Sequence, residues 1–203
     1  LFAGFGQNSK FGKFTQSDGQ LIQMVQIDPV VTIQDPLLIY NDTIYVPGRG
    51  HNDVSTTRNG SLLAYTTDLQ FKWRHDFETG SGSPGSFVRP AIGLDGTVFV
   101  QVAQDYLYAI NADGTNRWVK DINGIEYGPT IGHDGAIYVP ASESILSLNP
   151  SNGAIIWEYT LPDSPKSVIA LGPDSLGDGS KGSGGLFFFV QQKLKWLSSE
   201  GDT

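Results

Sequence analysis

The chain lacks cysteine entirely and has one methionine in 203 residues. Without cysteine it can form no disulfide bonds, thiolate metal sites or cysteine nucleophiles, although this does not settle its compartment. Only 17% of the residues are charged, and 21 acidic against 13 basic residues give a net charge of −8. Nucleic acids and anionic membrane surfaces are bound through Lys and Arg patches. We therefore expect neither as a partner.

Long apolar runs are also absent. The longest apolar cluster, residues 186–190, has the length of a strand, far below the roughly 18 residues of a membrane helix, so we expect no membrane insertion. No leader peptide is visible, and the chain begins with Leu1 rather than Met, which suggests a processed form or a fragment. The HExxH, GxSxG and phosphate-loop motifs are missing, and no catalytic residue is predicted.

Internal repeats dominate what is present. Three segments begin with Pro and a short apolar run, turn at Asn, Asp or Gly, and continue as an alternating strand: "PLLIYNDTIYV" (36–46), "PAIGLDGTVFV" (90–100) and "PTIGHDGAIYV" (129–139). Each is followed by a second half that ends on tryptophan: "SLLAYTTDLQFKW" (61–73), "YLYAINADGTNRW" (106–118) and "ILSLNPSNGAIIW" (145–157). Such self-similarity is the signature of a repeat architecture.

Each repeat is predicted to contain four strands. Asp-Gly or Asn-Gly pairs separate the alternating runs at 95–96, 113–114, 134–135 and 152–153, and such pairs favour two-residue hairpin turns in which both residues have positive φ. No helical periodicity extends beyond one turn. Four antiparallel strands in each 40 or so residues predict an all-β fold, a β-propeller of four-stranded blades forming one domain over 1–203.

The ends of the chain predict about four blades. Three repeats cover about 36–76, 90–122 and 129–161, while 167–203 resembles the first three strands of a blade with Trp196 in the third. Residues 14–27 resemble the last hairpin of a blade and could complete 167–203 by strand exchange between the termini, which would close the ring. A segment of a larger, seven- or eight-bladed propeller would show the same pattern, so both interpretations stay open.

The segments "YLYAINADGTNRW" and "ILSLNPSNGAIIW" resemble the repeat of the pyrroloquinoline-quinone (PQQ) type propellers, well over 36–161 and weakly at the ends. The repeat is specific for the fold and not for the quinone. The resemblance implies that the repeat tryptophans dock between blades against a glycine turn of the neighbour. A tryptophan buries a large area, and its indole N–H needs an acceptor, so Trp118→Ala is expected to cost about 3–5 kcal/mol. The implied docking residues are Trp73, Trp118, Trp157, Gly114 and Gly153.

What the resemblance implies about activity depends on cofactor residues. Dehydrogenases of this type bind quinone and Ca²⁺ on the propeller axis, whereas other members, such as the propeller lipoprotein of outer-membrane assembly, bind none. No quinone-binding residue can be assigned here. We therefore expect an extracytoplasmic, non-enzymatic module without a cofactor that binds a protein or another copy of itself. A fragment of a PQQ-dependent dehydrogenase and a glycan-binding propeller are the alternatives.

Two insertions distinguish the first repeat from the others: 47–60, between its second and third strands, and 78–89, before the next repeat. In a propeller these two connections open on the same face, and insertions carry specificity. Arg and aromatic residues are favoured interface anchors, although long Gly/Ser loops are also simply tolerated. We call the following set the candidate partner face: Arg49, His51, Asp53, Arg58, Phe87 and Arg89.

Two further features are weaker. Asp174 and Asp178 lie in a Gly/Ser-rich stretch and could ligate Ca²⁺, but they lack the regular spacing of a calcium loop, and a solvated loop is the alternative. Asn41 and Asn59 begin Asn-X-Ser/Thr sequons, which carry glycans only in a host that glycosylates secreted proteins.

Overall fold

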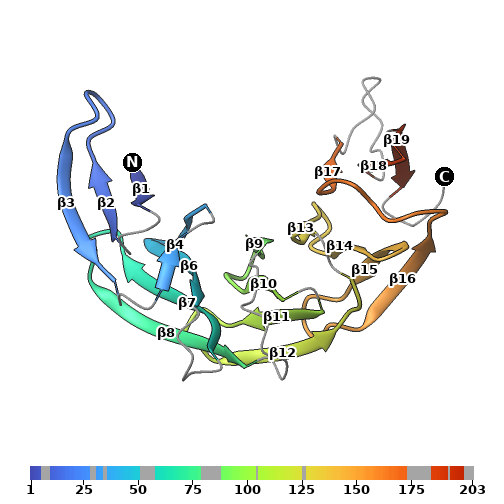
Figure 1. The fold of residues 1–203 in the computed structure, drawn as a ribbon, viewed down its shortest axis with the longest axis horizontal. Coiled ribbons are helices and arrows are strands. Elements are labelled where there is room, and N and C mark those ends of the chain that lie inside the picture. Colours follow the sequence, from blue (N-terminus) through green and yellow to red (C-terminus); the bar gives the residue numbers. More distant parts are fainter. Residues whose placement is uncertain are drawn as a thin grey trace.

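The computed structural model describes residues 1–5, 10–27, 31–33, 36–50, 58–78, 88–103, 105–124, 127–172, 184–191 and 193–198. These residues form only β-strands and their turns, in five antiparallel sheets that follow one another along an open arc (Figure 1). The first and last described strands, residues 2–5 and 193–198, lie on opposite arms of the arc. Within these ranges there is no helix of the length and apolarity required to span a bilayer.

The sheets are called blades here. Blade N contains β1 (Phe2–Phe5), β2 (Lys10–Phe14) and β3 (Leu21–Gln26). Blade 1 contains β4 (Val31–Ile33), β5 (Leu38–Tyr40), β6 (Thr43–Gly50), β7 (Arg58–Thr66) and β8 (Phe71–Glu78). Blade 2 contains β9 (Val88–Ile92), β10 (Val98–Val102), β11 (Tyr106–Ile110) and β12 (Asn116–Asp121). Blade 3 contains β13 (Thr130–Ile131), β14 (Ile137–Ala141), β15 (Ser144–Leu148) and β16 (Ile155–Thr160), and blade C contains β17 (Ala170–Leu171), β18 (Gly185–Val190) and β19 (Lys193–Ser198).

In the described residues the structure does not show the strand exchange between the termini, which was one of the two interpretations that the sequence left open. Residues 21–26 pair with β2, with Gly12 opposite Met24, and β2 pairs in turn with β1. In the described part of the chain, β19 pairs only with β18. The reason is local: residues 2–5 and 10–14 are themselves strands, so 14–27 completes a sheet with its sequence neighbours. Segment 14–27 therefore belongs to a fifth sheet, blade N, and not to 167–203.

The hairpin turns also differ from the predicted type. At the Asp-Gly and Asn-Gly pairs only the glycine has positive φ, for example +83° at Gly96. The Gly96 N–H donates to the Gly93 carbonyl, and Asp95 Oδ1 accepts the Thr97 N–H. This is a longer loop that ends on one left-handed glycine, the arrangement typical of a type I turn with a bulge. Among the described residues, two successive positive φ angles occur at Asn41 and Asp42, between β5 and β6.

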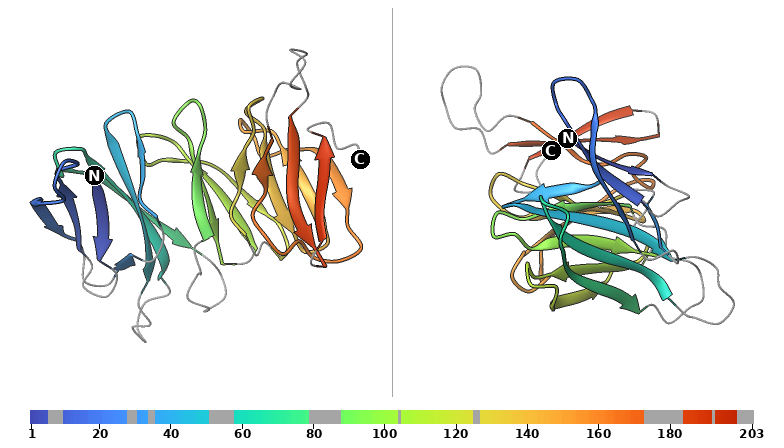
Figure 2. Two further views of the ribbon diagram at one scale, coloured as in Figure 1. Left: turned by 90° about the horizontal axis from the view of Figure 1, so that it is seen from above. Right: turned by 90° about the vertical axis from the view of Figure 1, so that its left-hand side faces the viewer.

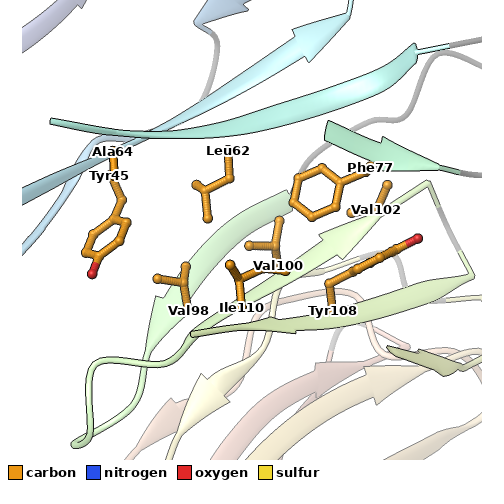
Figure 3. Packing of buried hydrophobic residues seen from close by; sticks show 9 residues of the cluster. All are labelled: Tyr45, Leu62, Ala64, Phe77, Val98, Val100, Val102, Tyr108 and Ile110. Carbon is orange, nitrogen blue, oxygen red and sulfur yellow. The ribbon is translucent and has the colours of Figure 1, made fainter. Parts of the chain in front are cut away.

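The core lies in four layers, one between each pair of neighbouring blades, which stand side by side along the arc (Figure 2). Strand alternation produces these layers, because successive side chains point to opposite faces. In β10, Val98 and Val100 face blade 1, where Leu62 and Phe77 meet them (Figure 3), while Phe99 joins the layer shared with blade 3. Each central strand is therefore buried on both faces, which explains why β10, β14 and β15 are buried throughout and β11 is buried except at Tyr106.

Candidate functional site

The repeat tryptophan of blade 1 docks on a turn of blade 2. The Trp73 Nε1–H donates to the Ala112 carbonyl at 2.9 Å. A Cβ atom built on Gly114, whose φ is +89°, would lie 2.7 Å from the indole ring of Trp73. The turn therefore needs glycine twice, once for its left-handed backbone and once for the close approach of the ring.

The next tryptophan repeats this geometry. Trp118 of blade 2 donates its indole N–H to the Pro150 carbonyl at 2.9 Å and covers Gly153, where a Cβ would lie 2.9 Å from the ring. Trp157 packs against Tyr138, with 5.8 Å between ring centroids, in the layer between blades 3 and C. The residues that follow β19 lie outside the described part of the chain.

A small residue on the third strand lets each tryptophan reach the second strand of its own blade. Ala109 pairs with both Phe99 and Trp118, and the two rings meet over it with centroids 5.8 Å apart. Ala64 and Ser147 hold the same register position in blades 1 and 3. In blade C, Trp196 pairs with Phe187 from the third strand, as the sequence predicts, and remains 47% exposed.

Two docking residues are not among those predicted. With its proton on Nδ1, the half-buried His75 donates to the Gly114 carbonyl at 3.0 Å. Tyr40 donates its hydroxyl to the Leu94 carbonyl at 2.6 Å and lies against Gly96. His75 follows Trp73 by two positions, so both side chains leave the same face of β8. That spacing is the signal in the sequence that identifies His75.

Charged side chains tie the two turns of blade 2 together. Arg117 donates to Asp95 of the first turn at 2.7 Å and to Asn111 of the second at 2.8 Å. Partial burial raises the pKa of Asp95, but hydrogen bonds from Arg117 and Thr97 outweigh it and hold that pKa below its usual value. The pKa of Asp113 is also lowered, first by the Thr115 hydroxyl and then by the Thr115 N–H.

The candidate partner face begins on a strand extension of blade 1. Strands β6, β7 and β8 have eight, nine and eight residues, against five in β10 and β11. The insertion predicted as a loop over 47–60 is therefore partly strand, because β6 and β7 stay paired through Gly48 and Ser61. Strand β4 also joins the far end of β6, with Thr32 opposite Arg49.

Both insertions leave the same edge of blade 1, because Arg58 pairs with Glu78 where β7 begins and β8 ends. The backbones of Arg49, Arg58 and Arg89 lie in β6, β7 and β9. His51, Asp53 and Phe87 lie outside the described residues, as do the calcium candidates Asp174 and Asp178.

Two further polar residues lie in separate turns. His133 is exposed in the turn between β13 and β14, and Asn41 lies in the turn between β5 and β6. Within the described ranges, no three His, Asp or Glu side chains are grouped so that they could hold a metal ion.

Comparison with known proteins identifies the fold. No protein-family model matches the sequence, and neither does any curated protein. Solved structures do match. Quinohemoprotein alcohol dehydrogenase from Comamonas testosteroni superposes with a TM-score of 0.73 at 12% identity, covering 100% of this chain. The chain has a β-propeller fold.

Two further structures support this assignment. BamB from Moraxella catarrhalis matches with a TM-score of 0.64 at 18% identity over 97% of this chain. A protein of unknown function from Bacteroides caccae matches with a TM-score of 0.59 at 16% identity over 98%. The chain spans 75% of the Bacteroides protein, 60% of BamB and 40% of the dehydrogenase.

Proposed function

We propose that this chain is an extracytoplasmic, non-enzymatic propeller of the PQQ-like repeat type that acts as a scaffold for binding another protein. The observation that carries the proposal is the strand extension of blade 1, because it is where the blade departs most from its neighbours. The extension rests on β4 and on the paired strands β6 and β7. Two arginines of the candidate partner face, Arg49 and Arg58, belong to β6 and β7 of this extension, and Arg89 belongs to β9 of blade 2.

The repeat tryptophans also support this proposal, because their contacts are structural. Trp73 and Trp118 have their indole N–H groups bound to turn carbonyls and their rings packed on glycines. These aromatic side chains are therefore committed to holding blades together. Recognition then falls to the irregular connections, as is usual when a rigid scaffold positions loops.

Site-specific photo-crosslinking tests the proposal. A photoreactive residue placed at position 49, 58 or 89 is expected to give the same adduct in an envelope fraction of the source cells. Placed at 193 or 195, on exposed positions of β19, it should not. Arg49→Glu combined with Arg58→Glu and Arg89→Glu should remove the adduct without changing thermal unfolding, whereas Lys193→Glu with Lys195→Glu should leave it. Adducts that form equally from all five positions would count against the proposal.

A dehydrogenase is the second candidate, because a quinohemoprotein alcohol dehydrogenase superposes on the whole chain. It is tested by titrating the purified protein with PQQ and Ca²⁺ and following the quenching of tryptophan fluorescence. Saturable quenching that requires Ca²⁺ would favour this candidate over the scaffold. Glycan binding has no comparable observation in its favour.

A further inference from the structure

The interface between blades 2 and 3 contains a groove. Its volume is ≈ 440 Å³. One wall is formed by the end of β12 and the other by β15 and β16, and β12 and β16 follow one another along the outer side of the arc (Figure 1). The described residues that line it are Lys120, Asp121, Ile122, Asn123, Ala141, Ser142, Glu143, Ser144, Leu146, Ile155, Glu158 and Thr160.

The strand registers show why this interface is open. In blade 2, Tyr106 pairs with Val102 and Tyr108 with Val100. In blade 3 the same register positions are held by Ser144, opposite Ala141, and Leu146, opposite Val139. A serine and a leucine thus stand where blade 2 has two tyrosines. The side chains of blade 3 at these two positions are therefore smaller than those of blade 2.

On the opposing wall, two aromatic side chains of blade 1 are likewise replaced by non-aromatic side chains in blade 2. Between blades 1 and 2, Phe77 packs on Tyr108 with 4.9 Å between centroids, and His75 packs on Phe77 at 5.1 Å (Figure 3 shows Phe77 and Tyr108). Lys120 holds the register position in blade 2 that His75 holds in blade 1. Ile122 follows Lys120 by two positions, just as Phe77 follows His75. The groove thus lies at the position that aromatic side chains occupy between blades 1 and 2.

The groove has an apolar floor and a negative rim. Leu146 and Ile122 are buried, while Ile155 is 47% exposed at the edge. Three carboxylates against one ammonium give the lining a net charge of −2, and no ion pair within 4 Å joins these four groups. The charged residues are Lys120, Asp121, Glu143 and Glu158.

A hydroxyl also lines the groove. Ser144 is 7% exposed, and its hydroxyl makes no hydrogen bond to any residue that the structure describes. The Ser144 oxygen is not one of the fully buried side-chain atoms without a partner among the described residues, so it is open to the groove. It can therefore accept a hydrogen bond from a bound group.

We propose that this groove binds the side chain of an arginine in an extended basic segment of a protein partner. The aliphatic stem of such a side chain suits a floor of leucine and isoleucine, and its guanidinium suits carboxylate and hydroxyl acceptors. Ser142 and Glu143 lie in the second-to-third-strand connection of blade 3. The groove therefore opens on the same face as the candidate partner face, one blade along. The inference rests on the proposed function only in that the basic segment belongs to a protein partner.

Nuclear magnetic resonance of the ¹⁵N-labelled protein tests this inference with two capped peptides, Gly-Ser-Arg-Ser-Gly and the same peptide with citrulline, a neutral isostere, in place of arginine. The arginine peptide should produce saturable shifts confined to 120–124, 141–146 and 155–160. Binding should be weak, with a Kd on the order of 1 mM, because one side chain supplies the contact. The citrulline peptide should bind at least about fivefold more weakly, because it carries no charge to pair with the carboxylates.

Variants locate the site. Ser144→Tyr with Leu146→Tyr rebuilds the blade 2 filling and should abolish the shifts. Glu143→Gln and Glu158→Gln should each weaken binding about twofold to fivefold. The matched control Asp42→Asn, at an exposed turn position of blade 1, should have no effect. If the tyrosine variant does not fold, the two glutamine variants decide the matter.

Three results would overturn the inference: no saturable shift, equal binding of the citrulline peptide, or binding that survives in the folded tyrosine variant. The combined Arg49→Glu, Arg58→Glu and Arg89→Glu variant separates this site from the proposed function. This variant should keep the peptide shifts while losing the crosslinked adduct. The proposed function and the proposed groove can therefore be refuted independently.

Discussion

At the scale of single residues, this propeller depends on pairs in which one partner must be glycine. The ring of Trp73 occupies the space that a side chain at position 114 would take, and Trp118 does the same at Gly153. The tryptophan and the glycine belong to different blades, so each constrains the sequence of the other across the interface. A substitution at the glycine is thus a test of docking as well as of backbone strain.

Gly114→Ala and Gly135→Ala separate these two effects. Both glycines have positive φ, +89° and +82°, but a Cβ at Gly135 would have nothing within 4 Å. Gly135→Ala should therefore lower the free energy of unfolding only by the backbone strain, about 1 kcal/mol. Gly114→Ala should lower the free energy of unfolding by about 3 kcal/mol, because the Trp73 indole must also move. Urea unfolding measures both, and equal losses would mean that the indole moves without cost.

At the scale of elements, the hairpins of a blade are held to one another through their turns. Arg117 leaves β12 and reaches Asn111 in the turn before its own strand and Asp95 in the turn between β9 and β10. The Asp95 carboxylate also accepts the Thr97 N–H of its own turn. One side chain pair therefore connects the first and second hairpins of blade 2 at the edge where blade 1 docks.

This ion pair predicts a pH dependence. The pKa of Asp95 is lower in the folded protein than in the unfolded chain, where it is about 3.9. Its contribution to stability is therefore fully present above about pH 4 and is lost as the pH falls through the folded-state value. Because the carboxylate side chain is 54% exposed, solvent screening limits the contribution to less than about 1 kcal/mol.

Asp95→Asn should accordingly lower the free energy of unfolding at pH 7 and make little difference at about pH 2. Urea unfolding at several pH values, compared with Asp42→Asn, measures this difference. A gap between wild type and Asp95→Asn that persists undiminished at the lowest pH would show that the carboxylate charge is not responsible.

At the scale of the whole molecule, the arrangement is a row of sheets in which each blade shares a core layer only with its neighbours. Phe11 belongs to the layer between blades N and 1, and Phe188 to the layer between blades 3 and C. Blades 1, 2 and 3 stand between these two layers. Such quasi-one-dimensional architectures have stabilities that are close to sums of nearest-neighbour terms.

Phe11→Ala and Phe188→Ala should therefore act locally and additively. Each deletes a ring that is no more than 2% exposed, at a cost of about 3–4 kcal/mol. In hydrogen-exchange mass spectrometry, Phe11→Ala should accelerate exchange in blade N and in β6 while leaving β18 and β19 protected, and Phe188→Ala should do the reverse. A uniform acceleration across all five blades would show a single cooperative core instead.

Much of the architecture was determined by the sequence itself. The repeated proline, alternating strand and terminal tryptophan are local patterns, so they predict blades 1, 2 and 3 and the docking of Trp73 and Trp118. The position of Trp196 in a third strand also follows from the order of segments. These features depend on strand alternation and repeat spacing, which are written along the chain.

Only the tertiary structure decided which segments pair at the ends and where space remains between blades. Residues 14–27 carry a pattern that suits either of two partners, and the short loop to β2 selects the local one. The groove between blades 2 and 3 depends on Ser144 and Leu146 facing Lys120 and Ile122 across an interface. Because the residues of that groove come from strands of two different blades, no single repeat predicts it.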